Sequence, residues 1–535
     1  MVEGCIGGVF LKKIISLSII TIMFLNQLSV FGLESCNTLK FDDFISIYKD
    51  KNYKKEQTDA ILNIPIVNNN INVQSNYTYK THPKLKELVI LTQWDLEQNK
   101  SFEKIKNAFF SPEKLIETSL NDYSSNSFFL SSSSNKENSI DKFETIKEKI
   151  TKQSNILNNA DILVFNNITI GMPENDYKNT PLEIAQMLKY NYAFIPEFIE
   201  VDPVYIGLEP TTEYNIDQEK YKGLSGTAII SRFPLENVRI KHLTDVYDWY
   251  DIEKNNNYAL ENASRYAMKS VFKEENTRNV RVGGRKALLA DIKLPNQEKF
   301  TIVATQIEKR TRPNDRAKQV KNLLEQIKDI KNPVILAGNL NTTTYNHQPK
   351  GVKNVVKNKF TDPDALAETV FFFIVPVGVV VSWLVRPVFD IFRKVNDPTV
   401  ISIPIFSPNR EKKMFNAIKK FEFDDGYKFD FRGNPNTSIG SSKKMFSSSN
   451  ERGKKGYIST YKTQRNLGIS NYKISWIIAK SYNTKTNPNP KKDDISERMA
   501  PHFGMTLYEL NFSYAEPIAI QAPISAVFPI CDYNK

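Results

Sequence analysis

The sequence predicts an α/β sandwich, and two observations support this. Short apolar runs such as Leu88 to Leu91 and Asp161 to Phe165 have the length and composition of buried strands. They alternate along the chain with segments of helical spacing, such as Ser101 to Phe110. A chain of 535 residues with 40% hydrophobic content is long enough to bury a large core, in one elaborated domain or in two.

The expected elements follow from the spacing of apolar residues along the chain. Thr180 is the expected cap of a helix that has Pro181 at its first position. Strands are expected near 88–91, 161–165, 192–201, 227–231, 286–294, 299–305, 333–337, 472–479 and 518–530, and helices near 101–110, 140–157, 181–188 and 316–330. Residues 33–80 are expected to be polar and irregular, and residues 421–431 alternate as a strand does.

The N-terminus has the pattern of a secretory signal. Lys12 and Lys13 precede an apolar run from Ile14 to Leu25, and residues 30–32 (Val-Phe-Gly) put small or apolar residues at the positions that a signal peptidase reads. We expect cleavage after Gly32, which predicts an exported protein: periplasmic, on the outer surface or secreted. The alternatives are a membrane anchor, for which the run falls short of about 20 residues, and a lipoprotein, because residues 33–36 weakly resemble a lipidation box.

Cleavage would leave two cysteines, Cys36 and Cys531, near the two ends of the mature chain. In an oxidising compartment such a pair can form a disulfide. The sequence leaves both a disulfide and two separate thiols open.

The predicted organisation is a signal peptide (1–32), an N-terminal extension (33–84) and a domain (85–530). That domain contains a mobile surface insertion (121–139), an apolar segment (370–385) and a loop-rich insertion (403–470). The apolar segment Val370 to Val385 has no charged residue. A single membrane span would put the strands on its two sides into different compartments. A buried helix, or an exposed hairpin that contacts a membrane or a partner, therefore remains.

The formal net charge of +12 is spread over the whole chain. Local lysine runs such as Lys454 and Lys455 stand beside Asn, Ser and Gly, as in solvated loops. The charge therefore leaves the partner unknown. An anionic surface, a membrane or a protein could bind through Val370 to Val385 and the basic loops, and nucleic acid stays among the candidates.

Five short sequence segments along the chain resemble strand motifs of one family. Gly223 to Pro234 reads GLSGTAIISRFP, and Pro333 to Asn341 reads PVILAGNLN. They resemble "G-x-x-G-N-A-I-L-S-R-x-P" and "P-x-I-L-x-G-D-F-N" in the endonuclease/exonuclease/phosphatase family of metal-dependent phosphodiesterases and nucleases. Arg316 and Gln319 match its "R-x-x-Q" spacing. The resemblance covers about residues 85–530 and implies a four-layer α/β/β/α sandwich with long insertions.

The resemblance implies catalytic residues at certain positions, and this chain has a different residue at most of them. Asn167 takes the place of the family's metal-binding Glu, and Gln306 takes the place of its phosphate-contacting His. Asn339 takes the place of the Asp that activates water. These amides carry no charge and take up no proton near neutral pH. The vestigial positions are Asn167, Gln306, Asn339, Ser475, Ile520 and Gln521, the last two in place of the closing Asp-His.

Three candidate catalytic residues are retained: Asn341, Glu308 and His502. Asn341 matches the family's phosphate-contacting Asn. His502 marks a second possible location for the family's C-terminal Asp-His motif, at which the His is kept and the Asp is absent. We prefer the location at Ile520 and Gln521, because it lies at the expected end of the domain.

The sequence thus predicts an exported protein that is inactive as an enzyme and acts as a binding scaffold, with no cofactor. The alternative is a divergent phosphodiesterase, nuclease or phosphatase that uses Mg or Mn with Glu308, Asn341 and His502. Either protein could be an exported effector that acts in another cell.

Overall fold

The computed structural model describes residues 39–70, 79–82, 86–96, 102–126, 137–202, 216–255, 279–342, 411–430, 471–480, 502–514 and 517–530, with short pieces between 452 and 462 and at 499. The predicted signal peptide, Cys36, Cys531 and the apolar segment 370–385 lie outside these residues. Among the described residues, no helix is long and apolar enough to cross a membrane.

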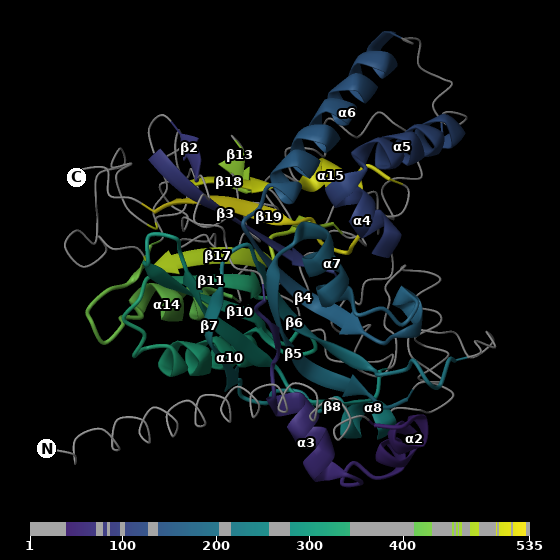
Figure 1. The fold of residues 1–535 in the computed structure, drawn as a ribbon, viewed down its shortest axis with the longest axis vertical. Coiled ribbons are helices and arrows are strands. Elements are labelled where there is room, and N and C mark those ends of the chain that lie inside the picture. The colour runs from purple at the N-terminus through teal and green to yellow at the C-terminus, as the bar shows by residue number, and fades with distance from the viewer. Residues whose placement is uncertain are drawn as a thin grey trace, which may run out of the picture.

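Two β-sheets form the centre of the described structure (Figure 1). Sheet A runs in the order β1 (Ile66–Asn68), β5 (Asn191–Glu200), β6 (Leu224–Ser231), β4 (Ile162–Ile170), β3 (Lys86–Asp95), β19 (Ile524–Pro529) and β18 (His502–Thr506), with β2 (Lys80–His82) on β3 and β8 (Arg281–Gly283) on β5. Sheet B runs β12 (Phe429–Asp430), β17 (Ser475–Lys480), β11 (Val334–Asn339), β10 (Lys299–Gln306), β9 (Lys286–Lys293) and β7 (Leu235–His242).

Each sheet contains one parallel strand pair, and helices connect both pairs. β3 and β4 are parallel and are joined through α4 (Phe102–Phe110), α5 (Pro112–Asn126) and α6 (Glu137–Asn158). β10 and β11 are parallel and are joined through α10 (Pro313–Gln326). Parallel neighbours need such crossovers, whereas the remaining described pairs are antiparallel.

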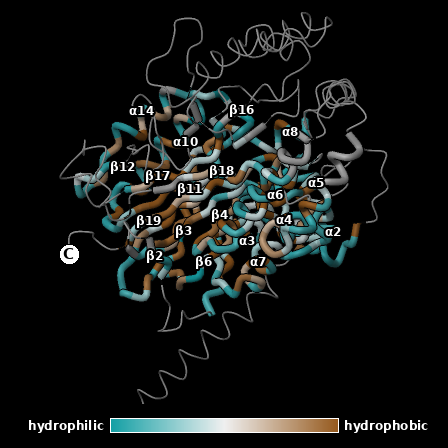
Figure 2. Tube along the Cα trace, turned by 90° about the horizontal axis from the view of Figure 1, so that it is seen from above, coloured by the Kyte–Doolittle hydropathy of each residue, from teal (hydrophilic) through white to brown (hydrophobic). Residues whose placement is uncertain are grey.

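Three apolar cores separate the layers. The core between the sheets contains Leu91, Val164 and Ile302. A second core lies between sheet A and the helices α4, α6 and α7 (Thr180–Leu188), and a third lies between sheet B and α10 with α14 (Lys412–Lys420). Figure 2 shows the hydrophobic strands enclosed by more hydrophilic helices. The fold is therefore α/β, with two stacked sheets and helices on their outer faces.

The N-terminal extension is more regular than the sequence predicts. Residues 33–80, expected to be irregular, contain α2 (Phe41–Lys49), α3 (Lys55–Asn63) and strand β1. Phe44 and Ile47 of α2 lie on one helix face and are buried, and the Phe44 ring packs edge-on against Tyr221. Tertiary packing thus stabilises a helix that is too short to be stable alone.

Other elements also differ from expectation. The cap of α7 is Asn179, whose side chain accepts from the backbone N–H of Leu182, and not Thr180. The segment 121–139 is partly helical, because α5 ends at Asn126 and α6 begins at Glu137. The predicted loop-rich segment 403–470 contains α14.

Within the described residues 421–430, only Phe429 and Asp430 belong to a strand, which is β12. The alternating rings Phe421, Phe423 and Phe429 pack on one another, and Gly426 makes the turn at a φ of 82°. The period-2 pattern therefore reflects an aromatic cluster around a turn. Two short helices, α8 (Asp251–Asn255) and α15 (Tyr508–Phe512), and a 3-10 turn (Pro173–Asn175) complete the described helical elements. Two short antiparallel strand pairs are Arg452–Gly453 with Gly456–Tyr457, and Tyr461–Lys462 with Asn471–Tyr472.

Candidate functional site

Apolar side chains give way to polar ones at one end of the space between the sheets. In β3, Val89 and Leu91 belong to the core between the sheets, and the same alternation continues through Gln93 to Asp95. Corresponding positions on the other strands are polar too. Together they form a buried polar layer: Gln93, Asp95, Asn166, Glu197, Thr227, Lys286, Gln306, Asn339 and Ser475.

Asp95 lies at the centre of this polar layer, with 1% of its surface exposed. Its Oδ1 accepts a hydrogen bond from Asn167 Nδ2 at 2.8 Å. Its Oδ2 accepts from Asn339 Nδ2 at 2.5 Å and from Gln521 Nε2 at 2.9 Å. Amide groups from three distant parts of the chain thus donate to both oxygens of one carboxylate.

Two of these amides, those of Gln521 and Asn339, are held in place by further contacts. Gln521 Oε1 accepts from the Ser475 hydroxyl at 2.7 Å. Asn339 Oδ1 accepts from the backbone N–H of Asn341 at 2.8 Å, and Asn341 Nδ2 donates to the Ile307 carbonyl at 2.6 Å. The amide oxygens of Gln521 and Asn339 therefore act as acceptors within the protein, while their NH₂ groups face Asp95.

The local backbone explains how Asn167 reaches Asp95. The pairing of β4 with β6 shifts between Phe165 and Ile168, which marks a bulge at Asn166 and Asn167. Asn167 has a φ of 52°, a left-handed conformation that Asn adopts more readily than most residues. Bulges re-aim side chains at the ends of strands. The bulge lets both asparagines take part in the polar network.

Asn166 joins the two sheets at this end. Its Oδ1 accepts from Gln93 Nε2 at 2.9 Å and from the backbone N–H of Asn339 at 3.2 Å. Its Nδ2 lies 3.1 Å from both Thr227 Oγ1 and the Thr305 carbonyl. Asn166 is therefore tied to both sheets and fixes their relative position at the polar end.

Arg285 organises an ionic branch of the network. Its guanidinium pairs with Glu197 at 2.8 Å and with Glu308 at 3.0 Å, and it donates to Gln306 Oε1 at 2.9 Å. Thr227 Oγ1 donates to Glu197 at 2.6 Å, which connects this branch to Asn166. Hydrogen bonds and ion pairs thus form a continuous network from Asp95, in the polar layer, to Glu308.

The two glutamates of this branch differ in acidity. Burial raises the pKa of Glu197 above its ordinary value, although Arg285 and Thr227 oppose the shift. Burial alone would raise the pKa of Glu308 as well. The Arg285 guanidinium, the Arg310 backbone N–H and the Trp249 indole together outweigh burial, so the pKa of Glu308 lies below its ordinary value. Glu308 is consequently charged and fully engaged near neutral pH.

Two arginines lie against the Trp249 ring beyond Glu308. The Arg281 and Arg310 guanidinium carbons lie 3.5 and 4.5 Å from the Trp249 ring centre. Arg281 pairs with Glu200 at 3.3 Å, and Arg310 pairs with Glu253. These paired side chains are all buried, which indicates a structural cluster that closes this end of the sandwich.

The residues around Asp95 do not fit a hard divalent cation. Such a cation needs converging oxygen ligands, and magnesium sites use carboxylates and water. Here the NH₂ groups of amides point at the carboxylate oxygens that a cation would occupy. In the described part of the chain, no group of three or more His, Cys, Asp or Glu side chains could hold a metal.

The structure brings most of the positions singled out by the sequence together. Asn167, Asn339, Ser475 and Gln521 meet around Asp95, and Asn341 adjoins Asn339. Gln306 and Glu308 belong to the Arg285 branch. Ile520 is partly exposed and precedes Gln521 in the chain.

His502 lies elsewhere. It is on the edge strand β18 and pairs with Val527, which pairs in turn with Ile90. Ile90 is three residues from Gln93, or about 10 Å along a strand. The backbone at His502 is thus offset from the polar layer, whereas Gln521 contributes to it.

The motifs do not identify the residues at the centre of the network. Asp95, Asn166 and Arg285 connect its branches. From the sequence, Asp95 is only one of the acidic residues, with Glu308, that could point into the site and support an enzyme, and Asn166 and Arg285 have no expected role. A signal existed for Asp95, because Val89, Leu91, Gln93 and Asp95 alternate on one face of β3 and become polar at its end. Arg285 precedes β9 and carries no such pattern.

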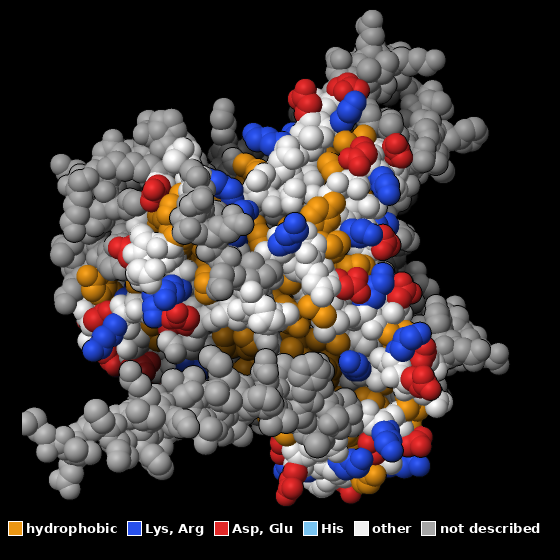
Figure 3. Space-filling model, in the orientation of Figure 1, with side chains coloured by type: hydrophobic (Ala, Val, Ile, Leu, Met, Phe, Trp, Pro, Cys, Tyr) orange, Lys and Arg blue, Asp and Glu red, His pale blue; other side chains and the backbone are white. Residues whose placement is uncertain are grey.

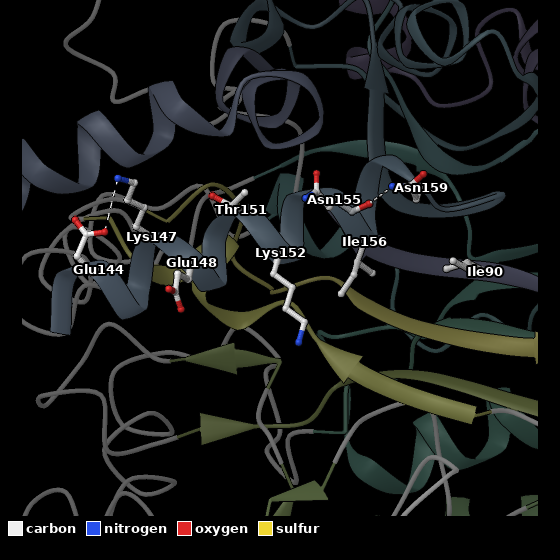
Figure 4. Close-up of a pocket in the computed structure, with 9 residues that line it drawn as sticks. All are labelled: Ile90, Glu144, Lys147, Glu148, Thr151, Lys152, Asn155, Ile156 and Asn159. Atoms are coloured by element: carbon white, nitrogen blue, oxygen red, sulfur yellow. Dashed lines mark hydrogen bonds and ion pairs between the residues drawn. The ribbon is translucent and has the colours of Figure 1, made fainter. Parts of the chain in front are cut away.

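A groove of about 590 Å³ lies elsewhere, along α6 (Figure 4). It is lined by Ile90, by Asn159 just after α6, and by Ile156 and charged or polar side chains of α6 from Glu144 to Asn155. None of the polar-layer residues lines it. This groove is therefore separate from the candidate site.

No family model matches the chain, and no curated protein matches it. Solved structures do resemble it. An endonuclease/exonuclease/phosphatase from Beutenbergia cavernae has a TM-score of 0.34 and 9% identity, over 83% of this chain and 72% of that one. The Neisseria 3' phosphatase NExo bound to a product DNA hairpin has a TM-score of 0.35 and 10% identity, over 82% and 99%.

An AP endonuclease from Archaeoglobus fulgidus has a TM-score of 0.34 and 11% identity, over 83% of this chain and 100% of that one. With TM-scores below 0.5 and such low identities, these similarities say nothing about the chemistry of the site. The solved structures that resemble this chain nevertheless include proteins of the endonuclease/exonuclease/phosphatase family, whose strand motifs its sequence also resembles.

Proposed function

We propose that this chain is an exported protein without phosphoesterase activity, in which the sandwich serves as a binding scaffold. One observation carries the proposal: the NH₂ groups of Asn167, Asn339 and Gln521 donate to the Asp95 carboxylate. In a metal-dependent phosphoesterase, carboxylates converge on a cation. In this chain, hydrogen-bond donors converge on a carboxylate.

Proton transfer is also unsupported by the residues present. Asn339 cannot accept a proton from water at a useful pH, and Gln306 cannot supply one. Glu308 is a carboxylate, but Arg285, Trp249 and the Arg310 backbone hold it in the charged state. Because catalytic groups act as a set, such losses together remove most of the rate enhancement.

The buried polar layer has a structural role in this proposal. Many of its side-chain polar atoms are hydrogen-bonded across both sheets, whereas Gln93 Oε1 and Gln306 Nε2 are buried without a hydrogen-bond partner among the described residues. The surface of a rigid sandwich then becomes available for binding. Export is supported by the basic residues Lys12 and Lys13 before an apolar run, and the mature N-terminus, read by sequencing the exported protein, is expected at Leu33.

The test combines metal binding with hydrolysis. Magnesium and manganese are titrated into the purified chain by calorimetry, and hydrolysis of bis(p-nitrophenyl) phosphate is followed with each metal. We expect neither saturable heat nor turnover above a heat-denatured control. Metal-dependent turnover that Asn341→Ala abolishes would contradict the proposal and favour the divergent phosphodiesterase, nuclease or phosphatase.

A further inference from the structure

We propose that strand β1, at one edge of sheet A, pairs antiparallel with β1 of a second copy of this chain and so forms a dimer. This inference goes beyond the proposed function, because it concerns the assembly of the chain and does not depend on the chemistry around Asp95. β1 pairs with β5 on one side, and no described strand pairs with its other side. The backbone groups on that side are therefore a template for another strand.

Exposed apolar side chains gather at this edge. Ile64, Ile66 and Val67 are 46%, 38% and 42% exposed, and they make up half of the exposed large hydrophobic residues in the described structure. The chain is already extended at Ile64, so Ile64 and Ile66 project on one face of the strand and Val67 projects on the other. A second strand would therefore find apolar contacts on both faces.

The edge is held in a fixed position at both of its ends. Before β1, the Leu62 carbonyl accepts a hydrogen bond from the buried Lys286 ammonium group. After β1, the Asn69 side chain donates to the Leu235 carbonyl at 3.0 Å and accepts from the Leu235 backbone N–H at 3.0 Å. A strand that is ordered in advance loses little conformational freedom when it pairs.

The absence of charge distinguishes β1 from β7, the edge strand of sheet B. β7 has Glu236, Arg239 and Lys241, and its pairing with β9 shifts between Glu236 and Arg239. Charged side chains and such irregularities keep edge strands from associating. From Ala60 to Asn70 no residue is charged, although charged side chains of both signs are spread over the described part of the face in Figure 3.

This absence of charge favours a second copy as the partner. Two identical chains with a formal net charge of +12 repel each other on average. A two-fold axis also places the same segment of both copies side by side, so a charge near the axis would face an equal charge. The edge at β1 avoids this repulsion. At the opposite edge of sheet A, Gly504 and Thr506 of β18 are buried, so that strand offers no comparable surface.

The experiment measures the oligomeric state of the purified chain by sedimentation velocity over a wide range of concentration. We expect a reversible equilibrium between monomer and dimer without larger assemblies, because pairing across a two-fold axis occupies the edge of both copies. In Val67→Lys, like charges would meet near the axis, and the dissociation constant of the dimer should rise about tenfold or more. Because Val67 is exposed, the thermal midpoint of the monomer should stay unchanged.

The matched control is Phe110→Lys, which replaces a hydrophobic residue of similar exposure, 39%, at the end of α4. It should dimerise as the parent chain does. Hydrogen exchange locates the contact, because the amides of β1 should exchange more slowly as the dimer forms.

Three outcomes would overturn the inference: a dimer that Val67→Lys leaves intact, equal weakening in both variants, or a parent chain that stays monomeric. If that monomer instead bound an unrelated strand-forming peptide at β1, the edge would belong to another partner. Hydrolysis is measured separately, so these outcomes leave the proposed absence of activity as it stands.

Discussion

At the scale of single residues, the most informative feature is the environment of Asp95. Its carboxylate accepts from Asn167, Asn339 and Gln521 in a buried site. If Asn167 and Asn339 were Glu and Asp, three carboxylates would meet here and repel one another unless a cation bridged them. Amides at these positions remove the repulsion and supply donors. The amides and the Asp95 carboxylate are therefore mutually compatible in this buried site.

We predict that Asp95→Asn destabilises the protein by about 2–4 kcal/mol. The new NH₂ group must face one or more of the three amide donors, and each buried donor without an acceptor costs about 1–3 kcal/mol. The measurement is urea unfolding of the variant beside Asp424→Asn, whose side chain is 60% exposed. The variant's midpoint should fall well below that of the control. Equal midpoints would mean that the amides do not depend on Asp95.

The buried Lys286 should make the free energy of unfolding depend on pH in the alkaline range. Its ammonium group is buried, donates to the carbonyls of Pro196 and Leu62, and has its pKa lowered to about 8, mainly by burial. Unfolding restores the ordinary value of 10.5. Between pH 8 and 10.5 the unfolded chain therefore binds more protons than the folded one, and stability rises with pH.

We expect this contribution to be about 1 kcal/mol per pH unit above pH 8. Urea unfolding between pH 8 and about 9.5 tests it, before most tyrosines ionise. The slope of stability against pH should flatten in Lys286→Met and persist in Lys318→Met, an exposed lysine. An unchanged slope in Lys286→Met would assign the effect to other groups.

At the scale of elements, α10 and α14 are joined by a buried ion pair. The Arg316 guanidinium contacts Glu411 through Nε and Nη2 and donates to the Thr311 carbonyl, and the ion pair is fully buried. The "R-x-x-Q" spacing thereby gains a structural meaning. Arg316 anchors α14, and Gln319 accepts from the Glu308 backbone N–H.

Removing one member of this pair should cost more than removing both. Arg316→Met leaves the Glu411 charge buried, with an expected loss of about 3–5 kcal/mol in unfolding free energy. The double variant Arg316→Met/Glu411→Leu should recover much of that loss. A double-mutant cycle by urea denaturation measures the coupling. Additive losses would show that the two side chains do not interact energetically.

The elements themselves could largely be predicted, because their patterns are local. The apolar runs predicted β3, β4, β6, β9, β10 and β11, and the 3.6-residue spacing predicted α4, α7 and α10. The unexpected helix α2 has a tertiary cause, because Phe44 packs on Tyr221. The alternation at Phe421 and Phe423 belongs to an aromatic cluster within the segment that was expected to be rich in loops.

At the scale of the whole molecule, the candidate site could be predicted only in part. The motifs located Asn167, Gln306 and Asn339 because each follows an apolar strand. They did not reveal that Asp95 is the common acceptor, since that requires β3 and β11 to be stacked from opposite sheets. Contacts between residues far apart in sequence depend on sheet order, which no local pattern encodes.

The final prediction uses the unfolding midpoint of the whole chain to test whether a cation binds beside Asp95. In Asn167→Glu/Asn339→Asp, two amide donors become carboxylates beside Asp95, so charge repulsion should lower the unfolding midpoint in metal-free buffer. A divalent cation would then bind the folded state alone and restore stability, by about 2.7 kcal/mol at a hundred times its Kd.

The parent chain supplies the comparison, because its amides already satisfy Asp95. Magnesium or manganese should therefore shift the thermal midpoint of the double variant and leave the parent chain unchanged. Asn296→Glu/Asn314→Asp, which makes the same exchanges in exposed segments, controls for added surface charge. A metal-dependent shift in the parent chain would show that the polar layer holds a cation as it stands. The retained Asn341 and Glu308 would then have to be reconsidered as parts of a working site.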